Sequence, residues 1–460
     1  MYQHFISFFL FSLSWTTALL AKPNMIVIMC DDLGYADVGF NGCKDIPTPH
    51  IDSIARNGII CTSGYVTYPV CGPSRAGFIT ARYPQRFGFE RNPQYQPDDP
   101  GMGLTREEKT IAELIKPRGY HCGIIGKWHL GAHIPTSHPM KRGFDEFYGH
   151  LGGGHFYFPE KLTIRRSQDA NDEMESYRTW LLKGYDPVPP RKYLTDDFSD
   201  EAVAFVERNR DWPFFLFLAY NAPHGPLEAT PEYLNRFSHI DEPKRKTYAA
   251  MVSAVDDGVG RLLSELEKYK LLENTIVVFL SDNGGITTKS GSSNLPLRGN
   301  KGEVWEGGFR VPFAIQWQGV LPKGSVYEYP VSSLDIGTTI VSLSGAEMPQ
   351  DKPLDGANLI PFLTGKDKSP PHPSIYLRKY DSDVFAVRNG NEKLVLSHKG
   401  ASPQLFDLEE DISEGNDLAK QRPKRVEELE KLRRQWNDEL IEPTFLGLIH
   451  RKGWGKKKKK

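Results

Sequence analysis

The sequence predicts an α/β fold with a smaller C-terminal subdomain. Short apolar runs alternate with amphipathic stretches over most of the chain, which is typical of strands and helices that alternate around a buried sheet. After about residue 370 the pattern changes to short strands separated by turn residues, which indicates an antiparallel sheet. The 460 residues are enough for one large domain and one or two smaller ones.

The elements of the large domain are expected where apolar runs and helical spacing occur. Continuous apolar runs predict buried strands at 25–29, 121–125, 214–219 and 275–280. Apolar residues at helical spacing predict helices over 109–114 and 248–269. The polar segment 162–191 is expected to be an insertion over the surface, of the kind that often shapes a substrate pocket.

The C-terminal part is expected to be a small α+β subdomain. A charged helix is predicted over 425–440. Short strands that form an antiparallel sheet are predicted at 374–377, 384–388, 393–397 and 403–408.

Both ends of the chain carry segments of their own. Residues 5–15 are apolar and small residues follow, which predicts a secretory signal peptide, although no Lys or Arg precedes the apolar run. The protein is then expected to be secreted or periplasmic. The lysine run 456–460 predicts a solvated tail, with a surface anchor for a polyanion as the alternative. The expected division is signal peptide 1–21, large domain 22–370, C-terminal subdomain 371–445 and basic tail 446–460.

Composition excludes several classes of protein. The formal net charge of −1 leaves no basic field that could hold nucleic acid, so no nucleic-acid partner is expected. Beyond the N-terminal run, no segment approaches the roughly 20 apolar residues of a transmembrane helix. The five cysteines are too few for a disulfide scaffold, and no CxxC pair supports a structural zinc site.

Polar clusters follow directly after the four strands predicted for the large domain. In open α/β sheets, ligands bind at the carboxyl ends of the strands, so these clusters are expected to meet in one cleft. In chain order the clusters are Asp31-Asp32, Gly126–Gly131, Asn221–His224 and Ser281–Gly285.

The residue types in these clusters predict a site for a divalent cation and an anionic ester. Three carboxylates and the amide of Asn283 are hard oxygen ligands, which suit Ca²⁺ or Mg²⁺. Without a cation the three carboxylates would repel one another. The alternative is that Asp31 and Asp282 merely cap helices. The carboxylates are Asp31, Asp32 and Asp282.

Cations and histidines accompany these carboxylates. A tetrahedral anion needs cationic and hydrogen-bonding partners for its oxygens, which Arg75, Lys127 and Lys301 could supply. His129 and His224 could transfer protons near neutral pH. Together these residue types predict a hydrolase that acts on anionic esters.

Four motifs carry a resemblance to a known family. Cys71-Gly72-Pro73-Ser74-Arg75 resembles the signature at which type I sulfatases have a cysteine oxidised to formylglycine, although a packed or disulfide-bonded cysteine in a turn is the simpler interpretation of this motif alone. Segment 119–129 is similar to the second sulfatase signature. Segments 294–312 and 404–409 resemble the lysine segment and the C-terminal strand motif of the family. The motifs follow the expected order between about residues 22 and 440.

The resemblance implies an architecture and a nucleophile. Type I sulfatases, in the alkaline phosphatase superfamily, have a large α/β domain with a central mixed, mostly parallel sheet flanked by helices, and a small C-terminal subdomain. A formylglycine-generating or sulfatase-maturating enzyme would oxidise Cys71 to the aldehyde, which hydrates to a diol. One hydroxyl attacks sulfur, and the other expels sulfate by re-forming the aldehyde. The residues implied to bind Ca²⁺, with Mg²⁺ as the alternative, are Asp31, Asp32, formylglycine at Cys71, Asp282 and Asn283.

The resemblance also implies roles for the cations and histidines. Arg75 and His129 would hold and activate the diol, and His129 would take a proton from its second hydroxyl. Lys127, His224 and Lys301 would bind sulfate oxygens. His224 or Lys301 would protonate the departing alkoxide. Because a sugar alkoxide is a poor leaving group, this help is worth roughly 10²–10⁴ in rate.

Two positions depart from the family pattern, and two other functions stay open. Ala81 stands where the signature usually has glycine, and Cys122 where it usually has serine or threonine. One alternative is a phosphoester or phosphonate hydrolase of the same superfamily, although most of those hold two transition metals with several histidines. The other is a non-catalytic polysaccharide-binding protein.

The expected substrate is a sulfated carbohydrate. Export, an anion-binding cleft and the aromatic segment 152–158 favour a sulfated poly- or oligosaccharide, and segment 86–93 is a candidate for the pocket wall. The resemblance extends to polysaccharide sulfatases, including those that act on algal galactans. Glycosaminoglycans and aryl sulfates remain open, as do the sulfated position and exo or endo action.

Overall fold

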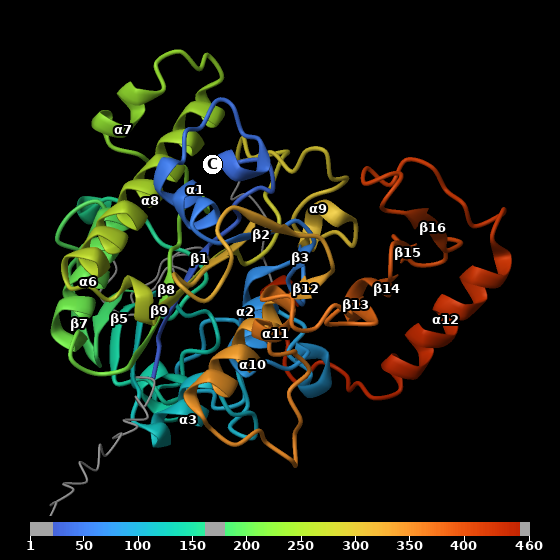
Figure 1. Ribbon diagram of the computed structural model, residues 1–460, viewed down its shortest axis with the longest axis horizontal. Coiled ribbons are helices and arrows are strands. Elements are labelled where there is room, and N and C mark those ends of the chain that lie inside the picture. The colour runs from blue at the N-terminus through green and yellow to red at the C-terminus, as the bar shows by residue number, and fades with distance from the viewer. Residues whose placement is uncertain (1–21, 162–179, 451–460) are drawn as a thin grey trace, which may run out of the picture.

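The computed structural model describes residues 22–161 and 180–450 (Figure 1). The signal peptide expected over 1–21 lies outside the described residues. So do residues 162–179 of the expected insertion and residues 451–460 of the expected basic tail.

The described chain forms three sheets. The strands of the ten-stranded sheet are β1 (Asn24–Cys30), β2 (Ile59–Cys61), β4 (His121–Lys127), β5 (Glu146–His150), β6 (Leu181–Lys183), β7 (Asp186–Val188), β8 (Phe214–Ala219), β9 (Thr275–Ser281), β10 (Phe313–Gln316) and β11 (Ser325–Tyr327). A two-stranded sheet pairs β3 (Gly64–Tyr65) with β12 (Val331–Ser332). The four-stranded sheet contains β13 (Ser374–Lys379), β14 (Val384–Asn389), β15 (Glu392–Leu396) and β16 (Gln404–Asp407).

The helices lie between these strands in the chain. They are α1 (Pro49–Arg56), α2 (Cys71–Thr80), α3 (Ile111–Ile115), α4 (Ile134–Ser137), α6 (Leu194–Asn209), α7 (Pro231–Arg236), α8 (Pro243–Lys268), α9 (Glu306–Phe309), α10 (Ser333–Ser344), α11 (Ile360–Leu363) and α12 (Pro423–Asn437). No helix in the described ranges is long and apolar enough to cross a membrane.

The large sheet is mixed and mostly parallel, as predicted. Its strand order is β11-β2-β10-β9-β1-β8-β4-β5-β6-β7. The central strands β9, β1, β8, β4 and β5 all run parallel, while β10 runs antiparallel to β9. The four central strands predicted from the sequence are β1, β4, β8 and β9, and all four lie side by side. Their carboxyl ends therefore meet at one edge of the sheet.

Alternating side chains of β1 bury both faces of the large sheet. Met25, Val27 and Met29 pack into a core with residues of α2, α3 and α10. Ile26 and Ile28 point to the opposite face and pack with residues of α1, α6 and α8. This alternation follows from the two-residue period of a strand, and helices on both faces explain why the strand is apolar throughout.

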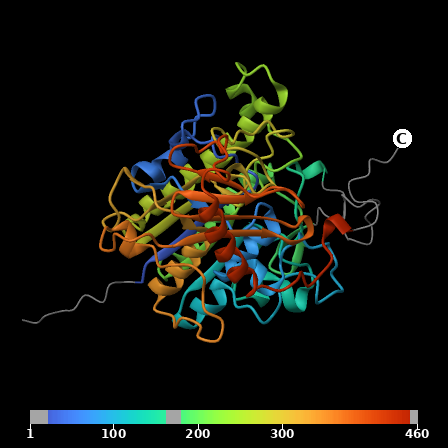
Figure 2. The ribbon, with the colours of Figure 1, turned by 90° about the vertical axis from the view of Figure 1, so that its right-hand side faces the viewer.

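The C-terminal subdomain is an antiparallel sheet with α12 on one face, as predicted (Figures 1 and 2). Ala386 and Val395 join the core of the large domain. Phe385 and Val387 point the other way and pack with Leu429 of α12. One face of the small sheet thus docks on the large domain while the other face is covered by its own helix.

Some elements differ from their predicted form. The helix predicted over 248–269 begins at Pro243, because the side chain of Glu242 caps the helix by accepting a hydrogen bond from Arg245 N. β5 was not predicted as a strand. The described end of the insertion predicted over 162–191 is no simple surface loop: it contributes β6 and β7, which extend the large sheet at its edge.

Candidate active site

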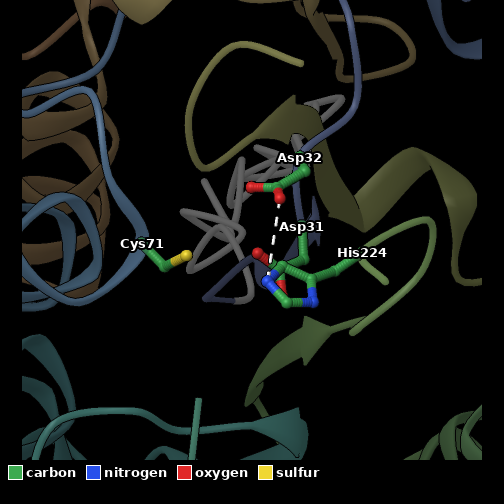
Figure 3. A group of neighbouring side chains, drawn as sticks. All are labelled: Asp31, Asp32, Cys71 and His224. Carbon is green, nitrogen blue, oxygen red and sulfur yellow. Dashed lines mark ion pairs between the residues drawn. The ribbon is translucent and has the colours of Figure 1, made fainter. Parts of the chain in front are cut away.

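The polar clusters predicted at the strand ends come together at the carboxyl edge of the large sheet. Asp31 and Asp32 follow β1, and Asp282 follows the adjacent strand β9. Lys127 ends β4, and His224 follows β8, which lies between β1 and β4. Figure 3 shows the carboxylates of Asp31 and Asp32 beside the imidazole of His224, with Cys71 across from them.

Cys71 is the first residue of α2 and is fully buried. Its backbone precedes Gly72, whose amide N donates a 2.8 Å hydrogen bond to Asn92 Oδ1. A Cβ at Gly72 would lie 2.8 Å from the same oxygen, so a larger residue here would require the Asn92 side chain to shift. Burial raises the pKa of the Cys71 thiol to about 12, against the lowering effect of Lys127 and Lys301. A thiol in this setting stays protonated and is a poor nucleophile.

The backbone at the end of α2 shows why the family signature usually has glycine at position 81. Ala81 is the C-cap of the helix and has a φ of 53°, in the left-handed region that favours glycine. Glycine is therefore the residue without steric cost at this position, and alanine adopts the same backbone at a cost of about 1 kcal/mol.

Lys301 joins Cys71 to the carboxylates. Its Nζ donates to Asp32 Oδ1 at 2.5 Å and to Cys71 Sγ at 3.1 Å. Burial opposes the charged forms of both partners, but Asp32 raises the pKa of Lys301 well above its ordinary value. Against the same burial, Lys301 and His224 hold the pKa of Asp32 at about 2. The two groups form a buried ion pair beside the sulfur.

Two more ion pairs are buried at the same edge. Lys127 Nζ lies 2.5 Å from Asp31 Oδ2, and Arg75 Nε lies 2.8 Å from Asp282 Oδ2. Arg75 also donates from Nη1 to Lys127 O at 2.9 Å. All four side chains are fully buried. Burial and the nearby Asp31 raise the pKa of Asp282 to about 6, against the pull of Arg75.

The site contains a group of buried carboxylate and amide oxygens that accept no hydrogen bond from the described part of the chain, here called the cradle. Asp31 Oδ1, Asp32 Oδ2 and Asn283 Oδ1 are buried and accept no hydrogen bond from any described residue. Asn283 faces the cluster, because its Nδ2 donates to Asp32 Oδ1 at 2.7 Å. Buried oxygens without donors are costly unless a cation occupies the space between them, and hard oxygens suit Ca²⁺ or Mg²⁺. The donor set therefore fits a divalent cation.

The alternative that these aspartates cap helices is wrong. Neither Asp31 nor Asp282 precedes a helix in the structure. Ligand atoms of Asp31, Asp32, Cys71 and His224 instead lie within 4.8 Å of one another. In the described ranges, this is the one group of three or more His, Cys, Asp or Glu residues that could hold a metal ion.

Both predicted histidines reach the site. His129 is buried and has a φ of 60°, and burial together with the cations Lys127 and Arg75 lowers its pKa well below the ordinary value. His224 contacts Gly225 O through Nδ1 at 2.7 Å, while its Nε2 lies 3.7 Å from Asp32 Oδ2 (Figure 3). Burial lowers the pKa of His224 to about 4. Both imidazoles are therefore neutral near pH 7 in the ligand-free protein.

Two neighbours of the site have contacts that were not predicted from the sequence. Asn92 lies in segment 86–93, which was expected to line the pocket, but its hydrogen bond from Gly72 N was not expected. His150 ends β5 beside Lys127 in register, is fully buried, and has an Nε2 without a partner among the described residues. The rule that polar residues follow strand ends would have found His150, had β5 been predicted as a strand.

The protein is thus an α/β protein with carboxylates, cations and histidines gathered at the carboxyl edge of its sheet. A family model described as Sulfatase matches residues 23–346, which is most of the chain. A second model, described as N-sulphoglucosamine sulphohydrolase, C-terminal, matches residues 300–442. The chain belongs to the sulfatase family.

A relative with an assigned activity supports this family assignment. The N-acetylgalactosamine-6-sulfatase of Sus scrofa is 35% identical over 363 residues, which cover 74% of this chain and 66% of that protein. The match thus spans a little less than two thirds of the length of that relative.

Solved structures match over nearly the whole chain. Ps i-CgsB, crystallised in complex with k-i-k-neocarrahexaose, is 40% identical with a TM-score of 0.87, over 92% of this chain and 95% of that chain. The PsFucS1 sulfatase from Pseudoalteromonas sp. is 27% identical with a TM-score of 0.77, over 91% and 90%.

Proposed function

We propose that this protein is an exported sulfatase that hydrolyses a sulfate ester of a sulfated carbohydrate. One observation carries the proposal. Cys71, at the start of a buried helix, lies against Lys301 and opposite two aspartates that each have one buried oxygen without a donor among the described residues. A buried thiol that stays protonated has no use as a nucleophile at this place. Conversion to formylglycine would instead make residue 71 a nucleophile, which is consistent with the sulfatase family.

The unused oxygens of Asp31, Asp32 and Asn283 support the proposed cation, whereas those of Asp282 accept hydrogen bonds from Arg75 and from Asp32 N. Asp31, Asp32, Asp282 and Asn283, with formylglycine at position 71, would hold Ca²⁺, or Mg²⁺ as the alternative. When bound, the cation would stabilise negative charge on the sulfate oxygens. Formylglycine, once hydrated, would supply a hydroxyl that attacks sulfur. The carboxylate pairs with Lys127, Lys301 and Arg75 hold the cradle in place.

The remaining side chains bind the sulfate and move protons. We assign sulfate binding to Lys127, Lys301 and His224, because their cationic or N–H groups surround the side of the cluster next to Cys71. Arg75 would orient residue 71, since its guanidinium is fixed by Asp282 and Lys127 O. His129 would accept a proton from residue 71, since its neutral imidazole is a ready base.

His224 is the proposed acid for the leaving group. Its Nε2 points toward the carboxylate cluster while its Nδ1 contacts backbone, so Nε2 is the atom that can donate to a departing alkoxide. An anionic sulfate placed beside the imidazole would raise its pKa from about 4 and favour the protonated form that an acid needs.

Sulfated poly- or oligosaccharides are the proposed substrates. A solved relative of 40% identity binds k-i-k-neocarrahexaose, so neocarra-oligosaccharides are the first compounds to test. The remaining parts of the proposal are a signal peptide over 1–21 that directs the protein to the periplasm or medium, a catalytic domain over 22–370, a C-terminal subdomain over 371–445 and a maturating enzyme as partner.

Mass spectrometry and an activity assay test the proposal together. The protein is produced alongside a formylglycine-generating enzyme, and the tryptic peptide 57–75 is weighed. Conversion of Cys71 lowers its mass by about 18 Da, because the aldehyde replaces CH₂SH. Released sulfate is then measured with aryl sulfates and neocarra-oligosaccharides. The Cys71→Ala variant should fold and release no sulfate. Sulfate release by that variant would refute the proposed nucleophile.

A further inference from the structure

The backbone that carries Lys301 belongs to a loop of the large domain. Lys301 lies between β9 and α9, outside any helix or strand. Its Nζ nevertheless lies 3.1 Å from Cys71 Sγ. A side chain on a loop keeps such a position only when other segments fix the backbone that carries it. The hydrogen bonds of this backbone therefore decide where the ammonium lies.

Three hydrogen bonds hold the backbone of Lys301 and the next residue, Gly302. Lys301 N donates to Gly285 O at 3.1 Å, and Gly302 N donates to Pro69 O at 2.8 Å. These two bonds attach the loop to the large domain. The third donor comes from the C-terminal subdomain, because Nζ of Lys379, the last residue of β13, donates to Gly302 O. Gly302 is thus held by both parts of the protein.

The side chain of Lys379 has no other partner that explains it. It is partly buried and forms no ion pair with any described carboxylate. Burial lowers the pKa of Lys379, against the opposite effect of the more distant Glu303 and Asp381. A partly buried ammonium without a counter-ion lowers stability. The stability of the subdomain therefore does not account for a lysine here, whereas a hold on Gly302 does.

Other contacts join the subdomain to the same segment. Glu306 N donates to Glu414 Oε2 at 2.7 Å, and Arg298 Nη1 donates to Glu414 O at 2.8 Å. The rings of Trp305 and Phe406 pack with 5.8 Å between their centres. These contacts lie before and after Lys301 in the chain, so the subdomain holds the segment on both sides of the lysine.

We propose that Lys379 is a positioning residue for Lys301, so that the C-terminal subdomain completes the active site of the large domain. The proposal rests on the function proposed above, which assigns Lys301 to the sulfate. Lys379 itself contacts neither the sulfate nor residue 71. It fixes Gly302 O and thereby the direction in which the side chain of Lys301 leaves the backbone. Without this bond the ammonium is less well placed, and sulfate release is slower.

A set of lysine variants tests this role. Lys379→Met removes the donor and keeps a side chain of similar length, whereas Lys379→Arg keeps a donor. Lys399→Met is the control, because it removes a lysine of the same subdomain that is 79% exposed. Each change is made in the native protein and in the Lys301→Met variant. Steady-state sulfate release gives kcat and KM, and thermal melting reports folding.

The effect on rate should depend on the presence of Lys301. We expect Lys379→Met to lower kcat about 5- to 50-fold and to change KM less than about twofold, because a small misplacement of a reacting group costs rate. Lys379→Arg should recover most of this loss, and Lys399→Met should show none. In the Lys301→Met variant, Lys379→Met should lower kcat less than about twofold further, because coupled residues are not additive. An undiminished loss in that variant would overturn the proposal, and so would an unchanged kcat in Lys379→Met alone.

Hydrogen exchange tests the same role without turnover. In protein with an unconverted Cys71, the amides of Lys301 and Gly302 should exchange about 10-fold faster in Lys379→Met, with exchange in β13–β16 unchanged. Equal exchange of these two amides in the native protein and in Lys379→Met would overturn the positioning role. A native protein that releases no sulfate would refute the proposed function instead, so the two proposals fail separately.

Discussion

The ammonium of Lys301 lies 3.1 Å from the sulfur of Cys71, and it is held there by the carboxylate of Asp32 at 2.5 Å. Lys301 comes from a loop before α9, whereas Cys71 starts α2, so the contact joins segments 230 residues apart. A cation in this position faces any negative charge that develops on a group bound at residue 71.

Replacing Lys301 should lower the rate of the reaction and, because it leaves the buried Asp32 without its lysine partner, should also lower stability. Lys301→Met removes a cation that would stabilise charge in the transition state, so kcat should fall about 10²–10³-fold. The effect on KM should be smaller. Steady-state sulfate release measures both constants, and Lys289→Met, an exposed lysine in the same loop region, is the control. A kcat within twofold of the native value would show that Lys301 does not act on the reacting group.

Removing one oxygen of the cradle should weaken cation binding. Asn283→Ala deletes a buried Oδ1 that has no donor among the described residues, so the affinity for Ca²⁺ should fall about 10–100-fold. Calorimetric titration of EGTA-treated protein with Ca²⁺ measures the affinity directly. Asn416→Ala, on an exposed turn, should bind Ca²⁺ as the native protein does. Equal affinities in all three proteins would remove Asn283 from the cation site.

The effect of removing the proposed acid, His224, on the rate should depend on the leaving group. His224→Gln keeps a hydrogen-bonding side chain but cannot deliver a proton, so release of sulfate from a sugar alcohol should slow about 10²–10⁴-fold. An aryl sulfate with an electron-withdrawing ring needs no such help and should slow far less. Comparing kcat for the two substrates gives the answer. The same loss for both substrates would assign His224 to sulfate binding alone.

A histidine of the chain before β13 should make stability depend on pH. His372 Nε2 lies 2.6 Å from Asp335 Oδ1 at the start of α10, and this carboxylate raises the pKa of His372 above 6.5 in spite of burial. A raised pKa in the folded state means that the stabilisation is complete below about pH 6.5 and is lost as the pH rises through the folded-state pKa. His372→Gln should therefore lose about 1–2 kcal/mol at pH 5.5 and less at pH 9.

Urea unfolding at the two pH values checks this difference. His398→Gln, which changes an exposed histidine of the same subdomain, should show no such dependence. A loss for His372→Gln that grows from pH 5.5 to pH 9 would contradict the sign of the shift.

Removing the buried charge of Lys393, between the C-terminal subdomain and the large domain, should lower the stability of the protein. Lys393 of β15 is fully buried and pairs at 2.8 Å with both Glu306 and Glu414. Lys393→Met would leave the buried carboxylate of Glu414 without a cation and Glu306 with Arg310 alone, and the free energy of unfolding should fall by about 3–5 kcal/mol. Urea unfolding measures the loss. Lys420→Met, at an exposed position, should lose less than about 0.5 kcal/mol.

Much of the fold and the identity of the site clusters could be predicted from the sequence, because burial leaves strong patterns. The strand predicted over 214–219 coincides with β8, since an apolar run with turn residues at both ends has few other interpretations. β6 and β7 could not be predicted, because edge strands of three residues carry polar side chains and a proline. The place of β6 is set by pairing with β5, a long-range contact, and β7 in turn pairs with β6.

The individual contacts of the site were beyond prediction for a related reason. Residue types indicated that Lys301 and Arg75 would meet an anion, but not that Lys301 would bridge Asp32 and Cys71. Segment 86–93 was expected to line the pocket, but nothing in it indicated that Asn92 would bind the start of α2, since an asparagine in a loop usually makes a turn. Its role depends on the backbone of Gly72 coming within 2.8 Å, which the fold alone determines.

Because Cys71 is completely buried, its proposed oxidation must come before folding. A side chain with no exposed surface, in a helix whose ten residues are all buried, is sealed from any other protein once the core has formed. An enzyme that oxidises Cys71 must therefore meet the chain before α2 packs. The proposed conversion would compete with folding from the moment the segment is made, and a chain that folded first would keep its thiol. The yield of active protein would then be decided by a race between two rates rather than by the stability of the final fold.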